Sequence, residues 1–410
     1  MALNIKFWLK ISLLNLFIVA ALGVLMRYKI GFEFPYLDQK HLQHSHSHFA
    51  FAGWLGHTLM VLMVYFLQTK IAEFNGNKYK NIVIANLICS YGMLVSFIIE
   101  GYGLFSITLS TASILVSYVF GYRFVKDLKS LDADLLAKNW FKAAIFFNII
   151  SSMGTFYLAY MMASKNFVQD FYLSSIYYYL HFQYNGWFFF ACMGLAFGFL
   201  NLRKSEHSFY ETPFKLFAIT CVPAYFLSTL WLDLPLWIYA ITVIAAIIQV
   251  FAWFKFLAIL LKTRKNALEN YSPLSRYILL LVSFALSVKL LLQLGSTIPF
   301  ISNLAFGFRP IVIAYLHLVL LAIITLFIMF YIYANHLVFI SKKIKYGIFL
   351  FSIGVLFNEI VLAIQGIASL SYTTIPYVNE ILFGIAIILF IGIGFTAYFS
   401  IKKVKNKPLL

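Results

Sequence analysis

Charged residues are scarce in this sequence. Of its 410 residues, 11% are charged and 14 are Asp or Glu, whereas 62% are apolar and 19% are aromatic. Soluble domains have about 25% charged residues, so the composition excludes a soluble globular protein. Apolar runs of about 20 residues recur along the whole chain, and each could cross roughly 30 Å of hydrocarbon as a helix.

Cysteine is also rare. The three cysteines lie apart inside apolar runs, and the sequence has no CxxC or CxxCH motif. This excludes a disulfide framework and covalently attached haem. The net charge of +17 resides in short loops between apolar runs. A nucleic-acid partner is therefore not expected, and the partner is the lipid bilayer.

The apolar runs predict an all-α membrane protein of about 12 transmembrane helices, with residues 1–410 as a single polytopic membrane domain. The expected spans are 7–27, 43–68, 81–99, 102–122, 140–162, 178–200, 214–232, 234–261, 275–294, 310–336, 346–368 and 378–401. With the N-terminus inside, most Lys and Arg, including those of the C-terminal segment, fall on the inner side. The charge bias predicts a multi-pass protein of the cell's inner (cytoplasmic) membrane with both termini cytoplasmic.

One seven-residue pattern occurs twice. Written from His48, "HFAFAGW" and "HFQYNGW" (His181 to Trp187) both read His-Phe-x-aromatic-x-Gly-Trp. These histidines and His317 lie at nearly the same depth on three expected spans, about 30 Å from the inner boundary. Imidazoles from separate helices suit iron or copper, although each could instead bond to backbone or water at the outer interface.

Helical periodicity divides the histidines of the second span. At about 100° per residue, His44 and His48 share one face, while His46 and His57 share nearly the opposite face. One haem iron cannot use both faces. The repeat aligns His48 with His181, so the choice between His46 and His48 stays open.

The same residues resemble a known family, subunit I of the haem–copper oxidases and nitric oxide reductases. His46 with Gly53 and Trp54 resembles the family's His-x-Asn-x-x-x-x-Gly-Phe pattern on helix 2. "AYLHLVL" (Ala314 to Leu320) resembles Ala-His-Phe-His-Tyr-Val-Leu on helix 10. The resemblance implies a bundle with a pseudo-threefold arrangement of helices 2, 6 and 10. It also implies His46 and His317 as ligands of a low-spin haem, and His181 in the place of a copper ligand.

The sequence departs from that family at its oxygen-reducing centre. Tyr315 replaces the high-spin haem ligand, the seventh span lacks the His-His pair, and Asn185 and Gln183 replace a tyrosine and a glutamate. The resemblance therefore predicts that the low-spin haem site is retained and that a standard oxygen-reducing centre is not. A single histidine holds copper poorly, so copper is not expected at His181, unless it and His48 form a changed metal site.

The stretch that begins at His46 also resembles a divergent branch of that superfamily, the haem- and copper-containing membrane proteins of nitric oxide response. Those proteins carry a His-x-His-x-x-x-x-Gly-aromatic stretch like the one that begins at His46.

Three other polar residues are candidates. Glu359, in the middle of the eleventh span, could relay protons or make a helix-packing hydrogen bond. Arg27 and Arg309 could pair with haem propionates, or anchor their helices at the interface.

The first hypothesis is therefore a redox protein with a bis-histidine b-type haem, possible oxidoreductase activity, and electron transfer or O₂/NO chemistry. Its electrons would come from quinol or a cytochrome, and other membrane subunits could join it. The alternatives are a transporter or channel for protons or metal ions, and a cofactor-free assembly partner.

Overall fold

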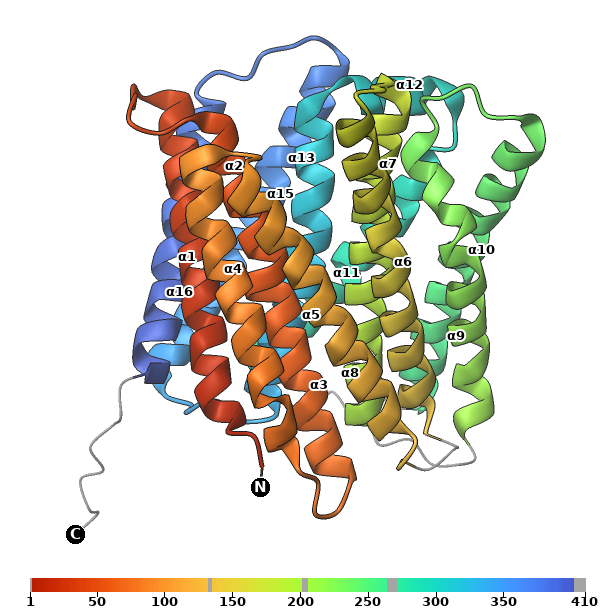
Figure 1. The fold of residues 1–410 in the computed structure, drawn as a ribbon. Coiled ribbons are helices and arrows are strands. Elements are labelled where there is room, and N and C mark those ends of the chain that lie inside the picture. Colours follow the sequence, from red (N-terminus) through yellow and green to blue (C-terminus); the bar gives the residue numbers. More distant parts are fainter. Residues whose placement is uncertain (1, 132–134, 201–205, 264–270, 402–410) are drawn as a thin grey trace.

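The chain folds into a bundle of helices (Figure 1). This computed structural model describes residues 2–131, 135–200, 206–263 and 271–401, and the side chains of 303–305 and 307 are left out. In that part of the chain every regular element is a helix. The α-helices are α1 (Ile5–Gly31), α2 (Gln39–His48), α3 (His57–Lys70), α4 (Lys80–Glu100), α5 (Leu104–Leu128), α6 (Leu136–Ser164), α7 (Gln169–His181), α8 (Phe189–Leu200), α9 (His207–Cys221), α10 (Leu236–Thr263), α11 (Pro273–Gly295), α12 (Pro299–Gly307), α13 (Arg309–His317), α14 (Leu326–Ala334), α15 (Lys342–Leu370) and α16 (Val378–Ile401).

Five further elements have other helical geometries. Three are π-helices: η1 (Phe49–Gly56), η3 (Phe182–Phe188) and η7 (Leu318–Thr325). Two are 3₁₀-helices: η2 (Gly76–Tyr79) and η5 (Pro223–Thr229). Each π-helix joins two α-helices without a break, so that α2–η1–α3, α7–η3–α8 and α13–η7–α14 are three continuous helical runs.

Ten helices in the described ranges are long and apolar enough to cross a membrane. They match ten of the expected spans and confirm an all-helical, multi-pass membrane protein. The two spans without such a match are 178–200 and 214–232. The first falls on α7, η3 and α8, and the second on α9 and the 3₁₀-helix η5, so the count of twelve stays a prediction.

The three π-containing runs have similar surroundings. Helices α1 and α4 contact η1, α6 and α9 contact η3, and α11 and α15 contact η7. The run from Gln39 to Lys70 is an inner one, because 83% of its apolar window is buried, whereas the window of α5 is 17% buried and faces outward. Each π-helix therefore contacts one α-helix that precedes its run and one that follows it.

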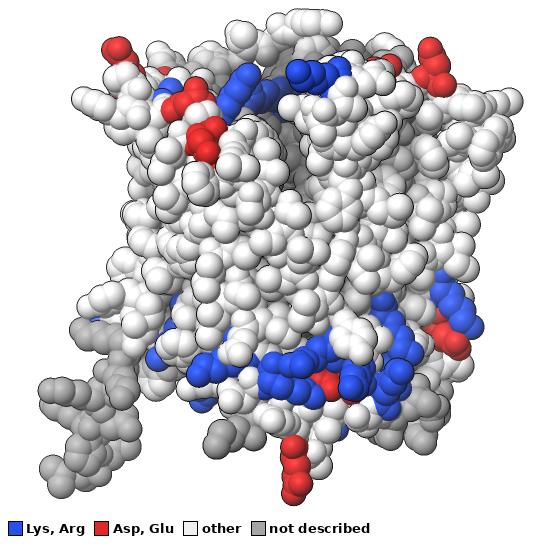
Figure 2. Space-filling view, in the orientation of Figure 1, with Lys and Arg blue, Asp and Glu red and all other residues white. Residues whose placement is uncertain are grey.

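Charge marks the two ends of the bundle. Helix α1 begins and α16 ends at the same end, which we call the terminal end, and α2 lies at the opposite, far end (Figure 1). Figure 2 shows a belt of Lys and Arg near the terminal end, a smaller group at the far end, and a broad uncharged band between them. The predicted cations of the C-terminal segment, 402–410, lie outside the described residues.

Candidate functional site

Each π-helix begins directly after a histidine. His48 precedes η1, His181 precedes η3 and His317 precedes η7. A π-helix bonds i to i+5, is rare, and occurs frequently at functional sites. These π-helices are the main feature that sequence reasoning missed. The repeated seven-residue pattern, which covers most of η1 and most of η3, was the one signal of them.

Side chains from neighbouring helices donate hydrogen bonds to backbone carbonyls of η1. Asn15 of α1 donates to the Gly53 carbonyl at 2.6 Å, and Asn86 of α4 donates to the Ala52 carbonyl at 3.1 Å. Tyr91 holds the Asn15 amide by donating to its Oδ1 at 2.7 Å. Because a change of helical period frees backbone carbonyls, these polar groups stabilise the π geometry in an apolar interior.

His46 lies on the run α2–η1–α3 and His317 on the run α13–η7–α14, near enough for the charges of the two rings to influence each other. His317 Nδ1 donates to the Ile313 carbonyl at 2.8 Å, so Nε2 carries the lone pair, and it has no hydrogen-bond partner in the described chain. The ring of His46 lies against α1, with Cε1 3.7 Å from the place that a Cβ on Gly23 would occupy. Its Nδ1 is buried and also lacks a partner. Two imidazole nitrogens are thus open for a ligand.

His48 faces away from this pair. Its Nε2 lies 3.1 Å from the Tyr102 hydroxyl, and its ring stacks on Phe97 of α4 with centroids 4.2 Å apart. The opposite faces expected for His46 and His48 are therefore observed. Between the two, the geometry favours His46 as the partner of His317.

His181 is fully buried and both of its ring nitrogens are bonded. Nε2 donates to the Cys221 carbonyl at 2.8 Å, since a carbonyl only accepts. Nδ1 consequently accepts from the Asn185 amide at 3.1 Å. In this arrangement His181 has no lone pair left for a metal, and it cannot join His48 in a shared site without breaking these bonds.

The remaining candidates lie apart from one another. Arg309 donates to Gln43 Oε1 at 2.8 Å at the far end, and Arg27 interacts electrostatically with His317. Glu359 on α15 accepts from the Asn358 side chain at 3.1 Å, which is its one hydrogen bond in the described chain. Both arginines remain candidates for pairing with an anion, whereas no interaction within the described residues connects Glu359 to the histidine pair.

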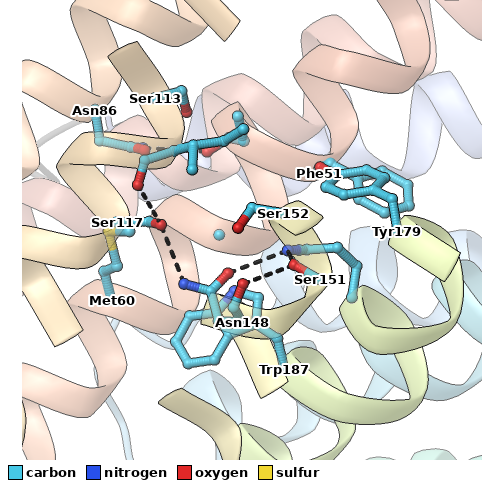
Figure 3. A pocket seen from close by; sticks show the side chains of 14 residues that line it. Phe51, Met60, Asn86, Ser113, Ser117, Asn148, Ser151, Ser152, Tyr179 and Trp187 are labelled. Carbon is cyan, nitrogen blue, oxygen red and sulfur yellow. Dashed lines mark hydrogen bonds between the residues drawn. The ribbon is translucent and has the colours of Figure 1, made fainter. Parts of the chain in front are cut away.

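A polar cavity of about 60 Å³ lies between η1, η3, α4, α5 and α6 (Figure 3). Asn148 donates to Ser117 at 3.1 Å, and Gln183 donates to Asn148 at 3.1 Å and to Ser151 at 2.8 Å. A site that holds a water needs at least about 10–15 Å³ and two to four polar partners, so this cavity can hold a few waters. The lining has no carboxylate.

No group of three or more His, Cys, Asp or Glu side chains suited to a metal occurs within residues 2–131, 135–200, 206–263 and 271–401. The donor set of the histidine pair is therefore two imidazoles. Such a set suits an ion that has further ligands of its own, such as haem iron.

No protein-family model matches this sequence, and no curated protein is significantly similar to it.

Proposed function

We propose that the protein is a twelve-helix membrane haem protein in which the imidazoles of His46 and His317 would hold one b-type haem. The observation that carries this proposal is that the two histidines come from separate helical runs and that each has a ring nitrogen without a hydrogen-bond partner in the described chain. The repeated packing around η1, η3 and η7 supports a pseudo-threefold bundle of the kind found in haem–copper oxidase subunit I.

The protein's own residues prepare this site in two ways. The Ile313 carbonyl fixes the orientation and tautomer of His317, so that Nε2 points away from its own helix turn. Burial of the His46 Nδ1 without a hydrogen-bond partner in the described chain favours a neutral ring, because a buried charge without a partner is costly. When bound, a haem supplies one-electron chemistry at an iron whose potential depends on its ligands and burial. Arg27, which interacts with His317, is available to pair with a propionate.

Electron transfer is the activity that the site favours over oxygen reduction. A second centre at the level of η3 would need open ligands, but both nitrogens of His181 are bonded and Tyr315 occupies the corresponding position on α13. A tyrosine hydroxyl is a poor substitute for imidazole at such a centre. Electrons would come from quinol or a partner cytochrome in the cytoplasmic membrane, with both termini on the cytoplasmic side.

The reduced-minus-oxidised visible spectrum of the purified protein tests the proposal. We expect haem bands in the wild type and in His48→Ala, and none in His46→Ala or His317→Ala. His46→Met keeps a side chain that can bind haem iron and should retain haem with shifted bands, which separates lost ligation from misfolding. A wild type without haem, or haem retained in both alanine variants of the pair, would overturn the proposal.

The polar cavity favours one second candidate, a path for protons through the membrane. Its hydrogen-bonded Asn148, Gln183 and Ser151 and its room for water would suit proton passage. Reconstituted vesicles test this: proton flux should fall in Gln183→Leu and remain in Gln365→Leu, a matched glutamine on α15. If the protein contained no haem and the vesicles showed no proton flux, the third hypothesis, a cofactor-free assembly partner, would be favoured.

A further inference from the structure

A second group of histidines lies on the other face of α2, at the far end of the bundle. His41, His44 and His48 follow one another at spacings of three and four residues, which places them along one face of the helix. This face packs against the end of α4 at Phe97 and against Gly101 and Tyr102 of the turn that follows it. The three rings thus meet the same short segment of chain.

His41 is held in place by that turn. Its Nδ1 lies 3.4 Å from the Ile98 carbonyl, and its Nε2 lies 2.6 Å from the place that a Cβ on Gly101 would occupy. Gly101 has φ +60°, a conformation that favours glycine. With one nitrogen near a carbonyl and the other against the backbone, His41 is not open to a ligand.

His44 and His48 differ from His41 in this respect. His48 Nε2 lies 3.1 Å from Tyr102 Oη, and the His44 ring lies edge-on to the Tyr102 ring with centroids 4.5 Å apart. The His44 ring is partly exposed and has no hydrogen-bond partner in the described chain. An open imidazole therefore lies next to a histidine–tyrosine pair, one helical turn from the other histidine.

We propose that His44, His48 and Tyr102 bind one divalent transition-metal ion, Zn²⁺ or Cu²⁺, at the far end of the bundle. Imidazole nitrogen suits both ions, and two histidines at i and i+4 are placed to bind one ion together. Ligands about 2.0–2.1 Å from a tetrahedral ion lie roughly 3.3 Å apart, which the observed His48–Tyr102 separation nearly matches. Water would complete the coordination.

This site is distinct from the proposed haem site. His46 lies between His44 and His48 in sequence but faces α1 and His317 instead. The metal ion would be held by residues of α2 and of the turn before α5, and it needs no haem. Binding would join these two segments through an ion in place of the His48–Tyr102 hydrogen bond.

The test measures Zn²⁺ and Cu²⁺ binding to full-length protein prepared without a polyhistidine tag. We expect one ion per chain, and a Cu²⁺ electron paramagnetic resonance spectrum with splitting from two nitrogens. His44→Ala should weaken binding by about 10–100-fold and leave a one-nitrogen spectrum, and Tyr102→Phe should weaken it by about 10-fold. His44 is partly exposed, so its removal should leave the fold intact.

Two control variants make the outcome decisive. His207→Ala removes a histidine at the start of α9 and should leave binding unchanged. His46→Ala should leave metal binding unchanged even if it abolishes haem, which separates this proposal from the haem proposal. Absence of stoichiometric binding by wild type, or equal affinity in wild type and His44→Ala, would overturn the metal site.

Discussion

The indole nitrogen of Trp54 donates a buried hydrogen bond of 3.0 Å to Thr325 Oγ1. These residues lie 271 positions apart, on the π-helices η1 and η7. The same hydroxyl donates to the Leu320 carbonyl at 2.8 Å. Thr325 thus accepts a hydrogen bond from η1 and donates one within its own π-helix. It links the two runs that carry His46 and His317.

Thr325→Val removes the hydroxyl with little change in shape. We expect it to lower the free energy of unfolding by about 1–3 kcal/mol, because it leaves the Trp54 N–H unsatisfied in an apolar interior. Thermal or denaturant unfolding in detergent measures this. A cycle with Trp54→Phe should give a coupling energy of about 0.5–3 kcal/mol, as for residues in contact.

Thr111→Val is the matched control for that substitution. Thr111 is exposed on α5 and bonds only within its own helix, to the Ile107 carbonyl at 2.9 Å. Its replacement should change stability by no more than about 0.5 kcal/mol. Equal effects of Thr111→Val and Thr325→Val would show that the link between η1 and η7 contributes nothing.

Gly154 lies where α6 packs tightly against the backbone of α7. A Cβ at this position would lie 2.6 Å from the Ser175 carbonyl oxygen and 3.0 Å from the Tyr179 backbone nitrogen. Backbone cannot move aside as a flexible side chain can, so Gly154→Ala should lower the free energy of unfolding by about 1–3 kcal/mol.

Gly384→Ala provides the comparison for Gly154. A Cβ at Gly384 on α16 meets no atom within 4 Å, so alanine there should be neutral or slightly stabilising through helix propensity. Unfolding of both variants in the same detergent gives the difference. If Gly154→Ala proved as stable as Gly384→Ala, then the close packing of α6 on α7 would be wrong.

Sequence reasoning could predict which segments are helices, because apolar length alone identifies a transmembrane span. It also predicted that His44 and His48 share a face opposite His46, since that depends only on helical period. It could not predict the bonds of His181, which depend on a carbonyl 40 residues away and on the rotation of η3. Nor could it predict the π-helices, because Asn15 and Asn86 come from other helices to satisfy them.

His57 and His181 are both fully buried, yet their surroundings differ. Neither ring nitrogen of His57 has a hydrogen-bond partner in the described chain, and its ring lies edge-on to Trp8 with centroids 6.0 Å apart. Both ring nitrogens of His181 are bonded. Comparing the two residues therefore tests how much a buried imidazole without hydrogen bonds lowers the free energy of unfolding.

His57→Leu should raise the free energy of unfolding or leave it unchanged, because leucine removes two unsatisfied polar atoms, each of which costs about 1–3 kcal/mol. His181→Leu should lower it, because the Asn185 amide and the Cys221 carbonyl lose their partner at a similar cost each. Unfolding of the two variants in one detergent measures the contrast. If His57→Leu destabilised the protein as much as His181→Leu, then the His57 ring must have a polar partner such as a bound water, and the apolar surroundings inferred for it would be wrong.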